Sequence, residues 1–94
     1  MMGIVSISIV CTDRGRHKSA ELARYDNRYA DEFAINAGKW LPSITTDSDS
    51  GTVGFRCPRC GRTPRRNETE FIEKYVKPVA EAGLRTLDIS WLGF

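Results

Sequence analysis

The chain has 94 residues, of which 28% are charged and 40% hydrophobic, and its formal net charge is +2. A chain of this length is expected to form one domain over residues 1–94 with a small core, for which a bound metal is a common source of extra stability. No apolar run is long enough to span a membrane. Three cysteines cannot all pair, and no signal peptide is recognisable, so a reduced cytoplasmic setting is expected.

Residues 4–10 are predicted to form a β-strand, because apolar residues alternate with Ser6 and Ser8. Alternate residues of a strand share one face, which places Ile9 and Cys11 together on the side that the protein would bury. Residues 11–17 then form a loop that begins at Cys11 and ends at the only histidine, His17.

Residues 19–41 are open to two interpretations. Four apolar side chains would fit one stripe of a helix: Leu22, Tyr25, Tyr29 and Phe33. Equally, Asp26-Asn27 could turn a hairpin between strands at residues 21–25 and 28–35. We favour the hairpin, because strands commonly follow a metal-binding loop.

The middle of the chain is predicted to be a polar loop over residues 43–51, followed by a strand over residues 52–57. The alternation in this strand puts Val53, Phe55 and Cys57 on one face. A second cysteine therefore leaves a strand on its apolar side.

The motif Cys57-Pro58-Arg59-Cys60-Gly61 is typical of metal binding. Two cysteines three residues apart can chelate one ion, and a glycine just beyond them permits the tight backbone that directs N–H groups at sulfur. The alternative is a redox-active pair of the thioredoxin type. That fold requires a long chain after the motif, whereas only 34 residues follow Cys60 and Pro64 blocks a helix starting there.

All three cysteines and the histidine are therefore assigned to one site, with Cys11, His17, Cys57 and Cys60 as ligands. A buried thiolate needs a compensating cation. One structural Zn²⁺ in a closed tetrahedral Cys3His site supplies it, with Zn–S near ~2.3 Å and Zn–N near ~2.0 Å. The alternative makes Cys11 a small buried hydrophobe and His17 a solvated loop residue.

The C-terminal third is predicted to contain a helix and a strand. Asn67 and Glu70 have the spacing of a capping box at a helix start, Pro78 predicts an interruption near Lys77, and Gly83 predicts the helix end. Residues 85–92 alternate as a half-buried strand that pairs with the N-terminal strand. The expected core residues are Phe71, Ile72, Tyr75, Val76, Leu87, Ile89 and Trp91; alternatively, this face is an exposed docking surface for a partner helix.

Basic residues gather around the predicted zinc site. They are Arg14, Arg16, Lys18, Arg56, Arg59, Arg62, Arg65 and Arg66, with only Asp13 opposing them. The rest of the chain holds six basic residues (14 − 8) and eleven acidic ones (12 − 1). Arginine favours planar contacts to phosphate or carboxylate, so nucleic acid is the first candidate partner and an acidic protein the second. A third interpretation is that the arginines only shield the thiolates.

At these residues a resemblance can be named. The segments Ile9–His17 and Phe55–Arg62 resemble the two zinc knuckles of small zinc-ribbon proteins of actinobacteria and their bacteriophages. The resemblance covers about 17 residues. It implies an α+β, zinc-ribbon-like domain with a central antiparallel or mixed sheet, two zinc knuckles and one C-terminal amphipathic helix. Such proteins usually act as binding modules on nucleic acid or on a host protein that they modulate, in the cytoplasm of a bacterium or an infected host. Typical ribbons use four cysteines, whereas this chain has a histidine at the fourth ligand.

The sequence argues against an enzyme. A catalytic zinc keeps one coordination position open, whereas the four predicted ligands close it. Zinc deaminases pair a His-x-Glu motif with Pro-Cys-x-x-Cys, but here Cys57 precedes Pro58 and no glutamate follows His17 at that spacing. We expect no catalytic residues, no small-molecule substrate and no membrane partner.

Overall fold

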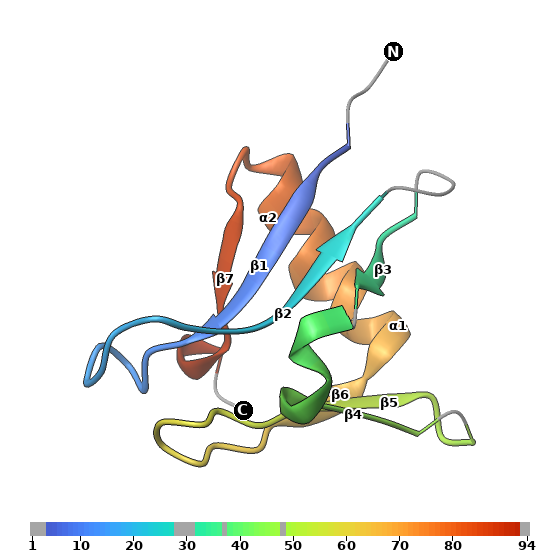
Figure 1. Ribbon diagram of the computed structural model, residues 1–94. Coiled ribbons are helices and arrows are strands. Elements are labelled where there is room, and N and C mark those ends of the chain that lie inside the picture. Colours follow the sequence, from blue (N-terminus) through green and yellow to red (C-terminus); the bar gives the residue numbers. More distant parts are fainter. Residues whose placement is uncertain (1–3, 28–31, 37, 48, 93–94) are drawn as a thin grey trace.

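The computed structural model describes residues 4–27, 32–36, 38–47 and 49–92. It is an α+β structure with a four-stranded sheet, a three-stranded sheet and a helical segment near the C-terminus (Figure 1). The helical segment lies behind the four-stranded sheet, and the three-stranded sheet lies below both. Among the described residues, no helix combines the length and the apolar character needed to cross a membrane.

The four-stranded sheet has the order β3-β2-β1-β7. Its strands are β1 (Ser6–Cys11), β2 (Ala20–Asp26), β3 (Ala34–Asn36) and β7 (Thr86–Asp88). β1 and β7 are parallel and the other pairs antiparallel, so the sheet is mixed. The predicted pairing between the N-terminal and C-terminal strands is confirmed.

The predicted hairpin in residues 19–41 is confirmed in that β2 pairs antiparallel with β3, and the helical interpretation is wrong. The second strand is Ala34–Asn36, shorter than the predicted 28–35, and a 3₁₀ helix, η1 (Gly38–Ser43), follows it. Tyr25 of β2 lies opposite Ile35 of β3, and Asp26, a predicted turn residue, belongs to β2 and lies opposite Ala34. Residues 28–31, which include Tyr29, lie outside the described residues.

The strand register shifts between Ile9 and Val10 of β1, which leaves two neighbouring β2 residues, Leu22 and Ala23, both buried. Two consecutive buried residues break the strict alternation of a strand, so the apolar spacing in β2 resembles that of a helix.

The three-stranded sheet has the order β4-β5-β6 and is antiparallel, with β4 (Ile44–Asp47), β5 (Thr52–Phe55) and β6 (Arg65–Asn67). The predicted polar loop over residues 43–51 is therefore wrong for residues 44–47. Only Ile44 of this edge strand faces the core, opposite Phe55, and the other three residues are exposed. An edge strand with one apolar residue shows no alternation by which it could be recognised.

The helical segment begins and ends where the sequence predicts. The side chain of Asn67 accepts the N–H of Glu70 (3.0 Å) before α1 (Glu68–Phe71). At the C-terminus of α2 (Lys77–Glu81), Gly83 has φ +80°, and the N–H of Leu84 donates to the carbonyl of Val79 (3.1 Å). These are an N-cap and a Schellman C-cap.

The interruption predicted near Lys77 takes the form of a π-turn, η2 (Ile72–Val76), between α1 and α2. The N–H of Lys77 donates to the carbonyl of Ile72, five residues earlier. Pro78 has no N–H, and its ring would clash with the carbonyl four residues earlier in a regular helix. A wider turn before Pro78 relieves both problems.

Phe71 joins the two sheets. Its ring centroid lies 5.8 Å from that of Tyr25 in the four-stranded sheet and 5.5 Å from that of Phe55 in the three-stranded sheet. The predicted core positions Phe71, Val76, Leu87 and Ile89 are buried, and Ile72 and Tyr75 pack partly buried against them.

Trp91 is not a core residue, so that prediction is wrong. The last strand stops at Asp88, and a 3₁₀ turn, η3 (Ile89–Trp91), follows. The side chain of Asp88 accepts the N–H of Ser90 (3.0 Å), which bends the chain away from strand geometry. Ile89 and Ser90 therefore point inward, and Trp91 is 64% exposed.

Candidate metal centre

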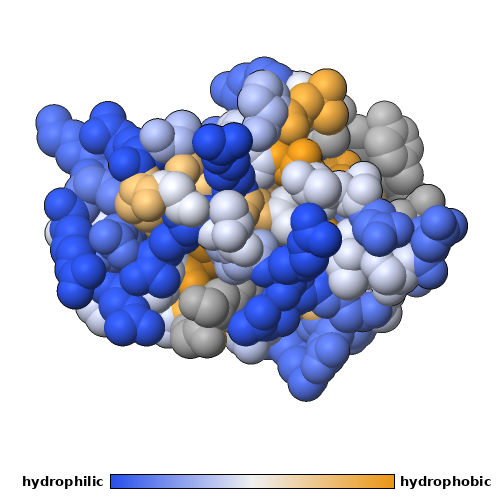
Figure 2. All heavy atoms as spheres, turned by 90° about the horizontal axis from the view of Figure 1, so that it is seen from below, coloured by the Kyte–Doolittle hydropathy of each residue, from blue (hydrophilic) through white to orange (hydrophobic). Residues whose placement is uncertain are grey.

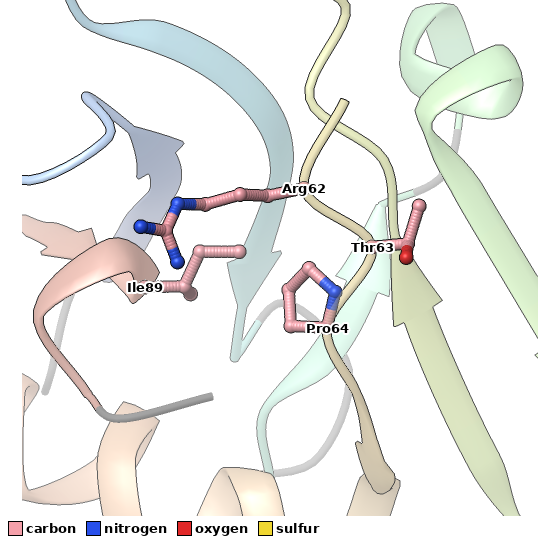
Figure 3. A pocket seen from close by; sticks show the side chains of 4 residues that line it. All are labelled: Arg62, Thr63, Pro64 and Ile89. Atoms are coloured by element: carbon pink, nitrogen blue, oxygen red, sulfur yellow. The ribbon is translucent and has the colours of Figure 1, made fainter. Parts of the chain in front are cut away.

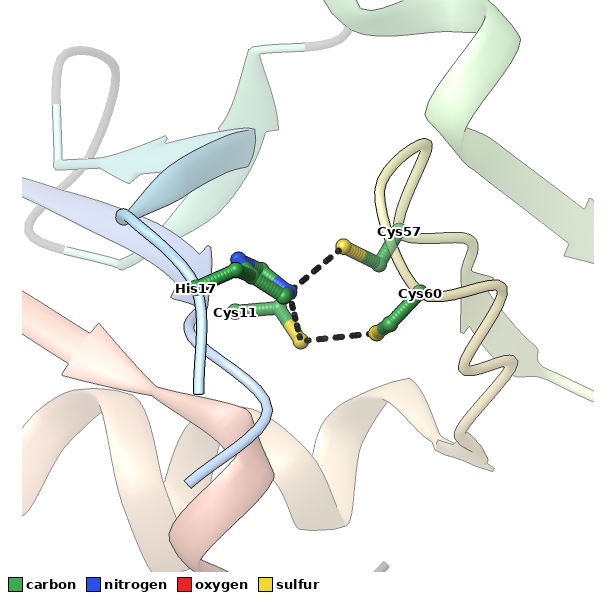
Figure 4. Close-up of side chains that lie close together, drawn as sticks. All are labelled: Cys11, His17, Cys57 and Cys60. Carbon is green, nitrogen blue, oxygen red and sulfur yellow. Dashed lines mark hydrogen bonds between the residues drawn. The ribbon is translucent and has the colours of Figure 1, made fainter. Parts of the chain in front are cut away.

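The four predicted ligands come together at one end of the two sheets. The sulfurs of Cys11, Cys57 and Cys60 and one ring nitrogen of His17 all lie within 4.8 Å of one another (Figure 4). Cys11 is the last residue of β1, and Cys57 follows β5 by two residues. His17 belongs to the first ligand loop, residues 12–18, and Cys60 to the second ligand loop, residues 56–64. The four side chains lie close enough to bind one metal ion.

Three of the six distances between donor atoms are close to those of a tetrahedral zinc site, and none of the six exceeds 4.8 Å. Sγ of Cys11 lies 3.7 Å from Sγ of Cys60, and Nε2 of His17 lies 3.6 Å from Sγ of Cys57 and 4.0 Å from Sγ of Cys11. Zinc–ligand bonds of ~2.3 Å to sulfur and ~2.0 Å to nitrogen would put two sulfurs roughly 3.8 Å apart and a sulfur and a nitrogen roughly 3.5 Å apart. The cysteines are free thiols, since a disulfide would bring two sulfurs to about 2.05 Å.

The imidazole of His17 is oriented for metal binding. Its Nδ1–H donates to the carbonyl oxygen of Lys18 (2.7 Å). This bond fixes the proton on Nδ1, so that Nε2 carries the lone pair that faces the three sulfurs. Metal-bound histidines are commonly held by such a second hydrogen bond.

The two buried thiols have different surroundings. Burial raises the pKa of Cys11 to about 12, and the backbone N–H of Asp13 opposes this only in part. Burial acts in the same direction on Cys57, but the backbone N–H groups of Cys60 and Arg59 outweigh it, so the pKa of Cys57 lies below its ordinary value. Backbone N–H groups directed at sulfur stabilise a thiolate, as the glycine of the motif predicts.

The first ligand loop has an unusual backbone. Asp13, Arg14 and Gly15 have φ values of +49°, +57° and +85°, and a left-handed conformation costs a non-glycine residue roughly 1–2 kcal/mol. The turn brings His17 back to the strand end, where its N–H donates to the carbonyl of Thr12 (3.0 Å). Such strain persists only where surrounding contacts impose it.

A hydrogen-bond network from η3 imposes this conformation. The hydroxyl of Thr12 donates to Oδ2 of Asp88 (2.5 Å), and Oγ of Ser90 donates to Oδ1 of the same carboxylate (2.6 Å). The N–H of Arg14 in turn donates to Oγ of Ser90 (2.9 Å). The roles of Thr12, Asp88 and Ser90 do not follow from the sequence, whose only local signal is the Asp88-Ile89-Ser90 spacing, typical of an Asx turn.

The second ligand loop is tight and is tied to the first. The N–H of Gly61 donates to the carbonyl of Cys57 (2.9 Å), and Gly61 has φ +76°. Nε of Arg62 donates to Oδ1 of Asp13 (2.7 Å), and this contact holds the pKa of Asp13 below its ordinary value.

Beside the cluster is a shallow hollow of about 220 Å³, lined by Arg62, Thr63, Pro64 and Ile89 (Figure 3). The side chain of Arg62 extends from the second ligand loop toward Ile89 of η3. Arg62 is the only ionisable group in this lining and is already paired with Asp13. The hollow therefore brings no second titratable group to the cluster.

The predicted binding cations differ in exposure. Arg62 is half-buried in its ion pair, whereas seven are exposed: Arg14, Arg16, Lys18, Arg56, Arg59, Arg65 and Arg66. Seen from below, the side of the molecule that carries the ligand loops is largely hydrophilic (left in Figure 2). Arg16 lies 3.9 Å from Asp13, and its side chain is 74% exposed, so this ion pair is weak.

Comparison of the chain with protein-family models, with curated proteins and with solved structures found no match. Function is therefore inferred from the geometry and charge of the metal centre and the surface around it.

Proposed function

We propose that the cluster binds one Zn²⁺ as a structural ion and that the two ligand loops are the knuckles of a zinc-ribbon-like domain. Three thiolates and one imidazole are the donor set of closed, four-coordinate zinc sites. Cys11 and Cys57 are 0% and 1% exposed and Cys60 is exposed, so solvent has little access to two of the three thiol ligands, which supports a structural ion. Metal-binding free energy would then contribute directly to folding of this small domain.

We further propose that the domain is a non-enzymatic module that binds nucleic acid through its exposed cations. The observation that carries this proposal is the charge balance of the two ligand loops. Asp13 is their only acidic residue and is paired with Arg62, while the cations on either side of it are exposed. Five of the seven exposed cations lie in these two loops, and Arg65 and Arg66 follow the second loop in β6. Three thiolates exceed the charge of one Zn²⁺ by only one unit, so these cations leave a local excess of positive charge.

The residue types favour a phosphate partner. Six of the seven exposed cations are arginines, whose planar guanidinium donates two parallel hydrogen bonds to a phosphate. Phosphates repeat at a regular spacing along a nucleic acid, so they can engage several cations of one loop surface together. An acidic protein surface is the alternative, and the experiment below separates the two partners.

The test is the salt dependence of binding to labelled DNA or RNA oligonucleotides. With two to four phosphate contacts, the slope of log K against log salt should be about −2 to −4 for a DNA duplex and about −1.5 to −3 for a single strand, and removing one contact should lower its magnitude by about 0.7 to 0.9. Arg59→Ala should show this change. Arg85→Ala is the matched control, because Arg85 is exposed in the turn between α2 and β7, at the opposite end of the molecule from the ligand loops (Figure 1).

Absence of binding at low salt, where the electrostatic attraction is strongest, would overturn the nucleic-acid proposal. The same surface would then be assigned to an acidic protein. In that case Arg59→Ala should slow association with the protein partner, because rim charges act mainly on the association rate.

A further inference from the structure

Trp91 is presented to solvent on a fixed turn. It is more exposed, at 64%, than the other large apolar side chains on the described surface, Ile4, Leu41 and Leu84. Asp88 caps the turn by accepting the N–H of Ser90, and the N–H of Leu92 donates to the carbonyl of Ile89 (3.2 Å). The indole is therefore exposed although the backbone that carries it is held at both ends.

The same turn is bonded to the basic first ligand loop. Arg14 donates from its backbone N–H to Oγ of Ser90 (2.9 Å) and from Nε to the carbonyl oxygen of Ser90 (3.2 Å). The guanidinium of Arg14 thus lies against the peptide bond that enters Trp91. Its two terminal nitrogens form no hydrogen bond to any residue that the structure describes. They are therefore available to donate hydrogen bonds to a ligand.

We infer that Trp91 and Arg14 form a binding position for single-stranded nucleic acid, in which the indole stacks on an unpaired base and the guanidinium contacts a neighbouring phosphate. This inference rests on the proposed function and adds the class of nucleic acid. Aromatic stacking combined with a basic surface is how proteins bind single strands without sequence preference. A stacking role also explains why the large apolar side chain of Trp91 is exposed to solvent next to Arg14.

Two observations favour a single strand over a duplex. An indole can stack only on a base whose face is open, and bases inside a duplex are covered on both faces. The helical segment cannot supply groove recognition either. Its two cations are already engaged, because Lys74 pairs with Glu70 (2.5 Å) and Lys77 with Glu73 (2.7 Å). The segment therefore presents no unengaged basic side chain to the phosphates that line a major groove.

The second tryptophan is a less suitable platform. Arg24 and Lys39 lie over the ring of Trp40, 5.3 and 4.8 Å from its centroid. Two cations near one ring compete with a base for its π-face. Trp91 is therefore the stacking residue in this account, and Trp40 provides the control.

The experiment uses the zinc-loaded chain and a short oligo(dT) strand, with a mixed-sequence duplex for comparison. The chain has two tryptophans, so Trp40→Phe leaves Trp91 as the only tryptophan reporter. We expect oligo(dT) to quench the emission of this variant as it binds. Trp91→Ala should weaken oligo(dT) binding about 5- to 150-fold, Trp91→Phe should weaken it less, and Leu84→Ala, another exposed apolar residue, should not change it.

Each outcome separates this inference from the function on which it rests. If the single strand and the duplex bind equally well and Trp91→Ala changes neither affinity, the stacking position is wrong and the nucleic-acid function stands. If no oligonucleotide binds at low salt, both proposals fail. The melting temperature and zinc content of Trp91→Ala show that the variant folds, which is expected because the side chain is exposed.

Discussion

Arg62 and Asp13 connect the two loops that carry the metal ligands. Nε of Arg62 lies 2.7 Å from Oδ1 of Asp13, and the two side chains are only 29% and 19% exposed. The contact spans 49 residues of sequence and lies beside the four ligands. It therefore ties the two ligand loops together, and a contact that restrains the loops lowers the ordering cost of metal binding.

Asp13→Asn should weaken zinc binding and strengthen nucleic-acid binding. Asparagine tolerates the left-handed conformation that Asp13 adopts (φ +49°), so the change removes the charge and spares the backbone. Zinc affinity should fall by up to about 10-fold, the lower end of what residues around a metal site contribute. Arg62 should become available to phosphate. Competition with a chromophoric chelator and the salt dependence of oligonucleotide binding measure the two effects; unchanged zinc affinity would show that the ion pair does not organise the site.

The four ligand positions should not be equivalent. Cys57→Ser and Cys60→Ser should each lose the metal and lower the melting temperature, because metal-binding free energy is folding free energy. His17→Ala should weaken binding less, since all three thiolates remain. Metal content per chain and thermal denaturation, with and without a chelator, measure this order. A Cys57→Ser variant with full zinc content would argue against the assigned ligand set.

The carboxylate of Asp88 should make stability depend on pH. Burial alone would raise its pKa, but the hydrogen bonds from Ser90 and Thr12 outweigh this effect and hold the pKa below the ordinary value. A group with a depressed native pKa stabilises the protein above the ordinary aspartate pKa, near ~3.9, and loses this contribution as the pH falls through the native pKa.

Asp88→Ala should therefore lower the free energy of unfolding by about 0.5–2 kcal/mol at neutral pH, as loss of a cap does. The difference from the unaltered chain should shrink below about pH 4. Asp88→Asn keeps one oxygen for the Ser90 cap and should cost less. Urea denaturation over a range of pH checks this, and an equal loss at every pH would contradict the charge argument.

Phe71 and Trp91 should respond very differently to truncation. Phe71 is 1% exposed and packs against three aromatic rings, so Phe71→Ala should cost roughly 3–5 kcal/mol. Trp91→Ala should change the free energy of unfolding by no more than about 0.5 kcal/mol, as surface substitutions do. Urea denaturation of the two zinc-loaded variants compares them; equal destabilisation would place Trp91 in the core after all.

The sequence predicts the elements that carry local signals. The alternation that ends at Cys11 and at Cys57 places both thiols on the buried side of their strands. Cys60 follows from its three-residue spacing to Cys57, and His17 is the only histidine in the sequence. All four members of the cluster can therefore be predicted from the sequence. Asn67 and Gly83 mark the helix ends because capping depends on a few neighbouring atoms. The pairing of β1 with β7 also follows, since the half-buried last strand needs a partner, whereas its parallel direction is set by the chain connection and is seen only in the structure.

The errors arise where distant contacts decide the structure. Residues 44–47 form an edge strand because β5 offers hydrogen bonds, although three of the four side chains stay in water. The β-branched Ile44, Thr45 and Thr46 are a weak strand signal that the surrounding serines and aspartates obscure. Leu87, Ile89 and Trp91 alternate with polar residues as in a strand, but the strand ends at Asp88, whose side chain caps the 3₁₀ turn that carries Trp91. The network among Thr12, Asp88 and Ser90 spans 76 to 78 residues, which no local pattern reveals.

The most direct test of the account is X-ray absorption at the zinc edge of the purified chain, together with its metal content. The account predicts about one zinc per chain, with three sulfur neighbours near ~2.3 Å and one nitrogen neighbour near ~2.0 Å. A folded chain that contains no metal and in which all three thiols react freely would contradict it, as would a zinc shell with fewer than three sulfurs.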